Sequence, residues 1–170
     1  MIGYTYLARF STFTALDVEK LTNNKKTAYS LLERLMKKGL VIKIRRNIYS
    51  CINPATGEVM ATKYQIACAT DSSAYLSHHT ALEYYGLTNQ VYNMVYVSSE
   101  SRSRGFEFDS KRYEFLPSLV REGVVDAKNT QGVRITDIER TVVDSIKDFE
   151  IIGGLEELLN CLEAITYLSE

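Results

Sequence analysis

The sequence predicts an α+β protein built from two domains. Residues 13–52 have the pattern of two helices followed by two β-rich runs, whereas the residues beyond 60 mix short strands with helices. The charge also changes sign between these two parts. A chain of 170 residues is long enough for one large domain or two small ones. The differences between its two parts favour two.

The charge divides the chain more sharply than its net charge of −1 suggests. Residues 1–52 hold ten Lys and Arg against three Asp and Glu, a net charge of +7, whereas residues 53–170 hold ten against eighteen, a net charge of −8. The change falls at a stretch that contains Pro and Gly, residues 53–59. We therefore expect a basic domain at 1–54 and an acidic domain at 58–170.

The composition is that of a globular protein, with 45% hydrophobic and 24% charged residues. The chain has no apolar run of about 18 residues and no signal-peptide pattern at its start, so we expect a cytoplasmic protein without membrane contact. The cysteines, Cys51, Cys68 and Cys161, are odd in number and lack C-x-x-C spacing. We expect them to be reduced, buried thiols and not zinc ligands or disulfides.

Two short helices are expected at the start of the chain. Aromatic and apolar side chains recur at helical spacing within residues 4–10. Thr14 is followed three residues later by Asp17, which is the pattern of a capping box and predicts a helix over residues 15–21.

A longer helix is predicted over residues 25–38. Asn24 is a favourable N-cap, and Gly39 suits the left-handed residue that often follows a helix. Four apolar residues fall at positions i, i+3, i+4 and i+7 and form one stripe: Ala28, Leu31, Leu32 and Leu35. This stripe predicts that one side of the helix is buried.

Two β-rich runs follow, at residues 40–44 and 48–52, around a polar turn at residues 45–47. This pattern predicts a β-hairpin. A helix, a short turn, a second helix and a hairpin in this order are typical of the winged helix-turn-helix, in which the second helix enters the major groove of DNA.

Burial of the apolar stripe turns six polar residues of the second helix outward: Lys25, Lys26, Thr27, Tyr29, Ser30 and Arg34. Long cationic and short hydroxyl side chains suit phosphates and base edges. The hairpin adds Lys43, Arg45 and Arg46, and arginine can clamp a phosphate or enter a minor groove. A basic helix is often only a solvated surface. The order of elements and the charge division together nevertheless favour double-stranded DNA as the partner.

The second domain is expected to combine strands and helices. The expected strands are 74–76, 92–97, 106–108, 112–116, 124–127 and 133–135, with a polar loop at 98–105. The expected helices lie near 60–69 and 78–85, from 138 onward, and near the end of the chain. The last two carry apolar stripes: Ile138, Val142 and Ile146, then Leu155, Leu158, Leu159, Leu162 and Ile165.

The sequence predicts no catalytic residues, no cofactor and no metal, and therefore a protein that is not an enzyme. His78 and His79 would project about 100° apart on a helix, and no third ligand has the right spacing, so a structural role at a helix start is expected. Ser77 lacks the Gly-x-Ser-x-Gly pattern of a nucleophile elbow. Asp137 and Glu139 are acids of a first helical turn.

Four segments resemble parts of one protein family. Residues 75–87 are Tyr-Leu-Ser-His-His-Thr-Ala-Leu-Glu-Tyr-Tyr-Gly-Leu, residues 134–144 are Arg-Ile-Thr-Asp-Ile-Glu-Arg-Thr-Val-Val-Asp, and Gly153-Gly154-Leu155 follow. Residues 38–49 resemble the family's wing, with Asn47 where Gly is expected; Asn also tolerates left-handed backbone, so the turn is retained. Together these segments resemble the AbiEi-type antitoxins of bacterial abortive-infection (type IV toxin–antitoxin) operons.

The resemblance implies a winged helix-turn-helix followed by a mixed α/β antitoxin domain, with Asn47 at the tip of the DNA-binding wing. It implies a transcriptional autorepressor that binds inverted repeats in its own promoter. Because one module of this size reads only a few base pairs, we expect paired half-sites and cooperative pairing of chains on the DNA. It also implies that the second domain counters a co-encoded nucleotidyltransferase-like toxin without forming a stable complex.

Two other functions remain open at this point. A winged-helix regulator could sense a ligand or dimerise through its second domain, and an apolar pocket with converging polar groups would favour ligand sensing. An enzyme with a DNA-binding module would need carboxylates clustered in a cleft, whereas those of this sequence are scattered.

Overall fold

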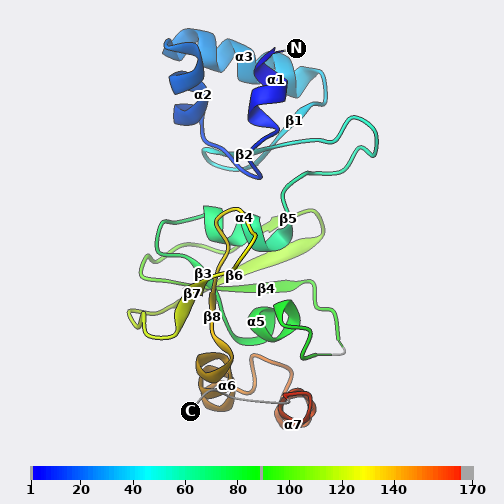
Figure 1. The fold of residues 1–170 in the computed structure, drawn as a ribbon, viewed down its shortest axis with the longest axis vertical. Coiled ribbons are helices and arrows are strands. Elements are labelled where there is room, and N and C mark those ends of the chain that lie inside the picture. Colours follow the sequence, from blue (N-terminus) through cyan, green and yellow to red (C-terminus); the bar gives the residue numbers. More distant parts are fainter. Residues whose placement is uncertain (1, 89, 166–170) are drawn as a thin grey trace. The chain divides into compact units, whose positions relative to one another are not determined.

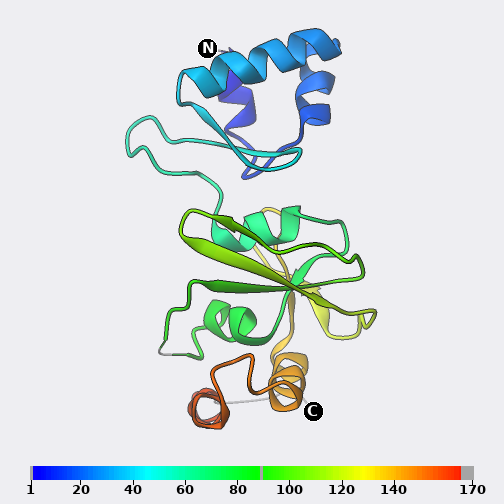
Figure 2. The same ribbon diagram turned by 180° about the vertical axis from the view of Figure 1, so that it is seen from behind.

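The structure is a computed structural model that describes residues 2–88 and 90–165 (Figure 1; Figure 2). It divides into two compact units, residues 1–70 (unit 1) and residues 71–170 (unit 2). Unit 1 carries eleven Lys and Arg against four Asp and Glu, whereas unit 2 carries nine against seventeen. The division in charge therefore follows the division in structure.

Unit 1 begins with three helices, α1 (Ile2–Leu7), α2 (Ala15–Thr22) and α3 (Lys25–Lys37). The helix expected at 4–10 starts earlier and ends at Leu7. Beyond Leu7 the N–H groups of Arg9 and Phe10 bond to carbonyls only three residues back, at 3.2 and 3.0 Å, which tightens the chain into a turn.

The expected caps of α2 and α3 are confirmed. The hydroxyl of Thr14 accepts a hydrogen bond from the Asp17 N–H at 3.3 Å, and the Asp17 carboxylate accepts one from the Thr14 N–H at 2.9 Å. The side-chain oxygen of Asn24 accepts from the Thr27 N–H at 3.0 Å. Gly39 follows α3 with φ +66°, in the left-handed region expected for it.

The expected hairpin is also present, as strands β1 (Val41–Arg45) and β2 (Ile48–Cys51). The sequence did not predict the third segment beside it. Phe13 pairs with Tyr49 through two backbone hydrogen bonds of 2.9 Å, and their rings stack at 6.1 Å. This pair fixes the start of α2 to the hairpin.

An apolar cluster fills unit 1, and the expected stripe of α3 is at its centre. The stripe residues Ala28, Leu31, Leu32 and Leu35 are all buried. They pack with residues from α1, α2 and the hairpin: Leu7, Phe13, Val18, Val41, Tyr49 and Cys51. Burial of each large apolar side chain contributes about 1.5–3 kcal/mol, so this packing holds the opposite side of α3 outward.

Unit 1 ends with a loop and a short helix. Ile52 pairs with Val59 across the loop between them. Helix α4 (Lys63–Ala69) starts later than the expected helix at 60–69, because Thr62 and Gln65 form a capping box that fixes its first turn.

Unit 2 is built around a six-stranded mixed sheet in the order β5-β6-β4-β3-β8-β7. Its strands are β3 (Tyr75–Leu76), β4 (Met94–Ser99), β5 (Phe106–Phe108), β6 (Lys111–Pro117), β7 (Val124–Asp126) and β8 (Arg134–Thr136). β4 pairs parallel to β6 and β3 parallel to β8, while the remaining neighbours are antiparallel. The α+β class expected from the sequence is confirmed.

The expected loop at 98–105 is wrong at its start. Ser98 and Ser99 extend β4 and are buried. Their hydroxyls lie 2.7 Å from that of Ser77 and 2.9 Å from that of Ser73, respectively. These hydrogen bonds satisfy polar groups that would otherwise be costly to bury.

The helices of unit 2 are α5 (His78–Tyr84), α6 (Ile138–Lys147) and α7 (Leu155–Glu163). Both views of the ribbon place α6 and α7 side by side at one end of the unit (Figure 1; Figure 2). Leu82 of α5 packs with Leu158 and Cys161 of α7 and with Ile152. The three cysteines are buried, as expected, and none of them forms a disulfide.

The expected buried faces of α6 and α7 are wrong in part. Ile146 is 53% exposed, whereas Thr141 and Ser145 are fully buried. The hydroxyls of Thr141 and Thr136 lie 2.7 Å apart, so a hydrogen bond and not an apolar contact orients α6. On α7, Leu158 is buried but Leu155 and Leu159 are 58% and 53% exposed.

Candidate nucleic-acid interface

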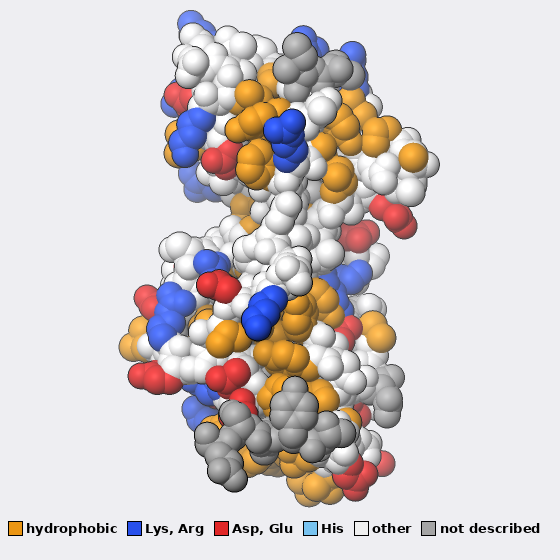
Figure 3. Space-filling model, viewed as in Figure 1, with side chains coloured by type: hydrophobic (Ala, Val, Ile, Leu, Met, Phe, Trp, Pro, Cys, Tyr) orange, Lys and Arg blue, Asp and Glu red, His pale blue; other side chains and the backbone are white. Residues whose placement is uncertain are grey.

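All six predicted DNA-contacting residues of α3 are exposed. They are Lys25, Lys26, Thr27, Tyr29, Ser30 and Arg34. The hydroxyl of Thr27 lies 3.3 Å from the side-chain oxygen of Asn24, so this residue also supports the N-terminus of the helix. In Figure 3, Lys and Arg side chains lie along the edge of unit 1 that α3 forms.

The exposed residues of α3 lie on three adjacent strips. Lys26 and Ser30 are on the strip opposite the buried stripe, and Lys37 continues it at spacings of 11 and 7 residues. Lys37 is therefore a further candidate, which the helical spacing could have identified from the sequence. Glu33, which carries a negative charge, lies on the same strip of α3.

The flanking strips face different surroundings. Thr27, Ser30 and Arg34 line an open groove of about 470 Å³, together with residues of α1 and α2 that include Gly3 and Leu21. Lys25 and Tyr29 are one helical turn apart on the other side of α3. A DNA duplex that approaches α3 from the side opposite the buried stripe would therefore contact Lys26, Ser30 and Lys37 first.

The hairpin places its predicted residues at and near its tip. Lys43, Arg46 and Asn47 are exposed and Arg45 is half-buried. The pairing register shifts between Lys43 and Arg45, and such bulges change the direction of side chains along a strand.

Asn47 has a φ of +60°, in the left-handed region expected for it at the turn. It also has a structural role that the sequence did not predict. Its side-chain oxygen accepts a hydrogen bond from the N–H of Ala15 at 3.0 Å, in the first turn of α2. The hairpin tip is thereby held against the start of α2, while α3 begins just beyond the end of α2. With eight residues, α2 is about 12 Å long.

Unit 2 contains a Ser-His-Asp chain in which the serine and the histidine are buried and the aspartate is partly exposed. The Nδ1 atom of His78 lies 2.9 Å from the hydroxyl of Ser77, and its Nε2 atom lies 3.3 Å from the carboxylate of Asp148. Burial lowers the pKa of His78, while the hydrogen bond to Asp148 acts in the opposite direction. Ser77 is fully buried, and its hydroxyl also lies 2.7 Å from that of Ser98.

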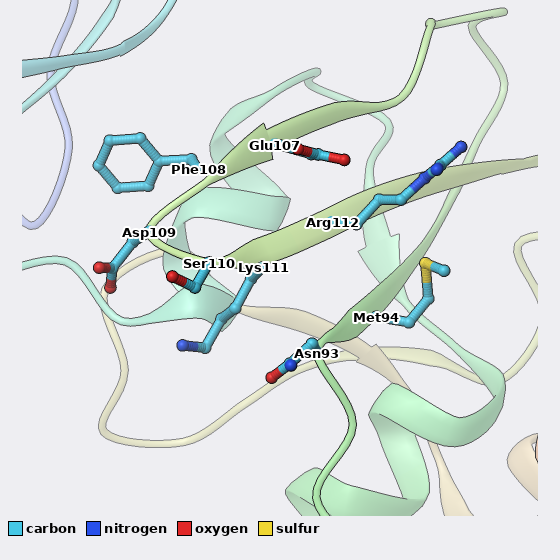
Figure 4. Close-up of a pocket in the computed structure, with 8 residues that line it drawn as sticks. All are labelled: Asn93, Met94, Glu107, Phe108, Asp109, Ser110, Lys111 and Arg112. Carbon is cyan, nitrogen blue, oxygen red and sulfur yellow. The ribbon is translucent and has the colours of Figure 1, made fainter.

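A pocket in unit 2 lies between the β5–β6 hairpin and the start of β4 and has a volume of about 420 Å³ (Figure 4). Its lining combines apolar surface, to which Met94 and Phe108 contribute, with polar and charged side chains. The side chains of Lys111 and Arg112 extend in opposite directions from it (Figure 4). These two cationic groups therefore do not converge on one point, as the polar groups of a ligand-sensing site would.

Within the described ranges, no three His, Cys, Asp or Glu side chains come together as a possible metal site. None of the helices that the structure describes is long and apolar enough to cross a membrane. Burial raises the pKa of the Cys51 and Cys161 thiols to about 11, which keeps them protonated and unreactive.

No protein-family model and no curated protein matches this chain.

Proposed function

We propose that unit 1 is a winged helix-turn-helix that binds double-stranded DNA, with α3 in the major groove and the hairpin tip on the flanking backbone. The observation that carries this proposal is the outward side of α3. Its cationic and hydroxyl side chains are exposed along the whole helix, while its apolar stripe is buried. Such side chains suit phosphates and base edges.

The position of the hairpin tip supports the same arrangement. The tip and the start of α3 lie at opposite ends of α2, a separation comparable to the major-groove width of about 12 Å. Arg46 can then contact a phosphate while Lys26 reaches into the groove. The seven cations of the two elements are Lys25, Lys26, Arg34, Lys37, Lys43, Arg45 and Arg46.

In the cell, we propose that the chain is a cytoplasmic autorepressor and antitoxin of a type IV toxin–antitoxin system. The support for this role is the resemblance of residues 75–87 and 134–144 to AbiEi-type antitoxins. Unit 1 would bind inverted repeats in the chain's own promoter. Unit 2 would counter a nucleotidyltransferase-like toxin without a stable complex.

The DNA-binding proposal is tested by titrating the chain against its own promoter duplex and a scrambled duplex of equal length. Measurements at several salt concentrations report how many phosphates are contacted, because the logarithm of the affinity falls with the logarithm of salt by about 0.9 per contact. We expect a preference for the promoter and a slope of about six. Equal binding to both duplexes, or a flat salt response, would contradict the proposal.

The antitoxin proposal needs a separate experiment. Lys25, Lys26, Arg45 and Arg46 are all replaced by Ala, and the variant is expressed from a foreign promoter beside the toxin encoded next to the chain's gene. We expect this variant to lose repression of its own promoter and still relieve growth arrest. Growth arrest that persists at normal protein levels would mean that neutralisation depends on DNA binding, and the antitoxin role of unit 2 would be rejected.

A further inference from the structure

The groove of unit 1 has the dimensions of a small-molecule site. Helices α1 and α2 lie on the same side of α3 in both ribbon views (Figure 1; Figure 2), and residues of all three helices line the groove. Its volume of about 470 Å³ falls within the range of about 300–1,000 Å³ that is usual for such sites. Small-molecule sites combine an apolar surface with a few polar groups that orient the ligand.

The apolar surface of the groove is formed by residues of the three helices. Leu21 of α2 is half-buried and Leu31 of α3 is 9% exposed, and both line the groove. At Gly3 of α1, a Cβ atom would lie 3.1 Å from a methyl carbon of Leu31. A side chain at this position would therefore cover part of Leu31, which glycine leaves accessible.

Two threonines line the groove near the start of α3, and their hydroxyls are held by Asn24. The hydroxyl of Thr22 donates to the Asn24 carbonyl oxygen at 3.0 Å, and that of Thr27 donates to the Asn24 side-chain oxygen at 3.3 Å. A hydroxyl has one proton to donate. Because both protons are engaged within the protein, this end of the groove offers methyl groups and not hydrogen-bond donors to a ligand.

Ser30 and Arg34 line the groove further along α3 and provide donors. They are exposed and lie one helical turn apart on the same side of the helix. A hydroxyl and a guanidinium at this spacing can donate to the two oxygens of one carboxylate. The described residues that line the groove include no acid, so this end of the groove favours a negative charge.

We propose that the groove binds a small carboxylate with an apolar body. The carboxylate accepts hydrogen bonds from Ser30 and Arg34, and the apolar body lies over Leu21 and Leu31. One guanidinium balances the single charge of a carboxylate, whereas a phosphate monoester carries a charge of about −1.5 to −2. The apolar surface favours a hydrocarbon body because its burial removes both surfaces from water.

Such a ligand would release the chain from DNA. Ser30 and Arg34 belong to the side of α3 that is proposed to contact DNA, so a carboxylate bound to them withdraws both residues from the duplex. This consequence rests on the proposed function, whereas binding of the carboxylate to the chain without DNA does not. Because coupling between two binding events is reciprocal, DNA should weaken carboxylate binding by the same factor.

Phenylbutyrate is a suitable probe, and its binding is followed through the amide resonances of the full chain in two-dimensional NMR spectra without DNA. We expect shifts confined to residues around the groove and a dissociation constant of about 1 mM, as is usual for so small a ligand in an open site. Phenylbutyramide has the same body without the charge and should bind about tenfold more weakly. Acetate has the charge without the body and should cause no saturable shift.

Three variants locate the site. Arg34→Gln should weaken phenylbutyrate binding about tenfold and leave phenylbutyramide binding unchanged, because only the acid uses the guanidinium. Leu21→Gln should weaken both ligands, because they share the apolar surface. Lys20→Gln is the control, since Lys20 is an exposed cation of the same unit that does not line the groove. It should bind both ligands as the native chain does, and far-UV circular dichroism verifies the helices of each variant.

The proposal would be overturned if the native chain bound the acid and the amide equally well. The same conclusion follows if Arg34→Gln bound phenylbutyrate with native affinity, if Lys20→Gln weakened it as much as Arg34→Gln does, or if the shifts fell outside unit 1.

Displacement of the promoter duplex at constant ionic strength separates this proposal from that of DNA binding. Phenylbutyrate at ten times its dissociation constant should weaken DNA binding about tenfold, and phenylbutyramide at the same concentration should have a smaller effect. A chain that binds DNA but no phenylbutyrate would overturn the groove site alone. A chain that binds phenylbutyrate but no DNA would reject the proposed function alone. Simultaneous binding of both would contradict displacement and remove Ser30 and Arg34 from the DNA interface.

Discussion

The two units have different kinds of interior. Among the described residues of unit 1, one polar side chain is buried, that of Ser50. In unit 2 the buried polar residues are Ser73, Ser77, His78, His79, Thr80, Ser98, Ser99, Thr136, Thr141, Ser145 and Glu157. Unit 1 is therefore held mainly by apolar packing, which tolerates approximate geometry, whereas unit 2 also depends on directional hydrogen bonds.

Because their interiors differ, we expect the two units to respond differently to amino-acid substitutions. Apolar packing leaves the outside of unit 1 free to carry cations, because none of the exposed residues of α3 is needed for its core. In unit 2 the same residue that satisfies a buried hydrogen bond often sets the orientation of a helix, as Thr141 does for α6. We expect replacement of the outward lysines of α3 to affect binding alone, and small polar changes in unit 2 to affect folding.

The largest expected effect is on DNA affinity. Replacing Lys25, Lys26, Arg45 and Arg46 by Ala removes four cations from unit 1 without touching its core. We expect affinity for the promoter duplex to fall by about a thousandfold or more and the salt slope to fall by about four. The melting temperature should change little. Lys128→Ala in unit 2 removes an exposed cation and is the control, with unchanged affinity. Normal binding by the quadruple variant would refute the assignment of the interface to unit 1.

The next effect concerns the apolar interior of unit 1. Leu35 is fully buried in the cluster beneath α3. Leu35→Ala should lower the free energy of unfolding by about 2–5 kcal/mol, because it removes packed atoms and leaves a cavity. Leu16→Ala is the control in the same unit, since Leu16 is 55% exposed, and should change it by about 0.5 kcal/mol or less. Similar losses for both variants in urea denaturation would show that the cluster does not stabilise the unit.

The contrast between the interiors also explains what the sequence could predict. In unit 1 the caps at Thr14 and Asn24, the stripe of α3 and the turn at Gly39 are local signals, and each was confirmed. The contacts that join these elements were not predicted. Phe13 pairs with Tyr49, 36 residues away along the chain, and no local pattern marks such a pair.

In unit 2 the strands were predicted more successfully than the buried faces of the helices. Alternating and β-branched residues identified all six strands, but Ser98 and Ser99 were assigned to a loop because they are polar. Apolar periodicity also selected Ile146 as a buried residue of α6, while Thr141 is buried instead. A hydroxyl with a buried partner leaves no periodic signal in the sequence, so such a face cannot be found from hydrophobicity alone.

The polar interior of unit 2 gives the third prediction. The hydroxyl of Thr141 is 2.7 Å from that of Thr136 and 2.6 Å from the carbonyl oxygen of Asp137. Thr141→Val keeps the shape but leaves these groups without that partner, and should cost about 1–3 kcal/mol. Thr141→Ser retains the hydroxyl and should cost less than the valine variant. If valine were tolerated as well as serine in thermal unfolding, the hydrogen bond would not orient α6.

Variants of Asn47 test whether the hairpin tip can be changed so that DNA affinity falls while the stability of unit 1 is kept. Asn47→Ala loses both the tolerance of left-handed backbone and the bond to Ala15, and should cost about 1–2 kcal/mol. Asn47→Gly keeps the backbone freedom and should cost less. Asn47→Asp keeps an acceptor beside the start of α2, where negative charge is favourable, but adds an anion to the interface. It should melt near the native temperature and bind DNA more weakly. Unchanged DNA affinity would place the tip away from the duplex.

The smallest expected effect is a pH dependence in unit 2. Burial lowers the pKa of His78 below its ordinary value of 6.5. As the pH falls through that value, the unfolded chain therefore takes up a proton that the folded chain does not. Proton uptake by the unfolded state lowers stability, so the free energy of unfolding should fall between about pH 7.5 and pH 5.5. His78→Asn removes the titration and tolerates the φ of +51° found at this position.

Two variants establish whether His78 is the group responsible. Burial is the largest influence on the pKa of His78 and lowers it, as does the charge of Arg140; the hydrogen bond to Asp148 and the charges of Asp144 and Asp148 act in the opposite direction. Asp148→Asn removes one of the raising influences, so it should enlarge the gap between folded and unfolded pKa and steepen the loss of stability with acid. His78→Asn should flatten the same curve. Urea denaturation at each pH measures both slopes. If the histidine variant keeps the native slope, another group titrates in this range, and the Ser-His-Asp chain does not make unit 2 sensitive to acid.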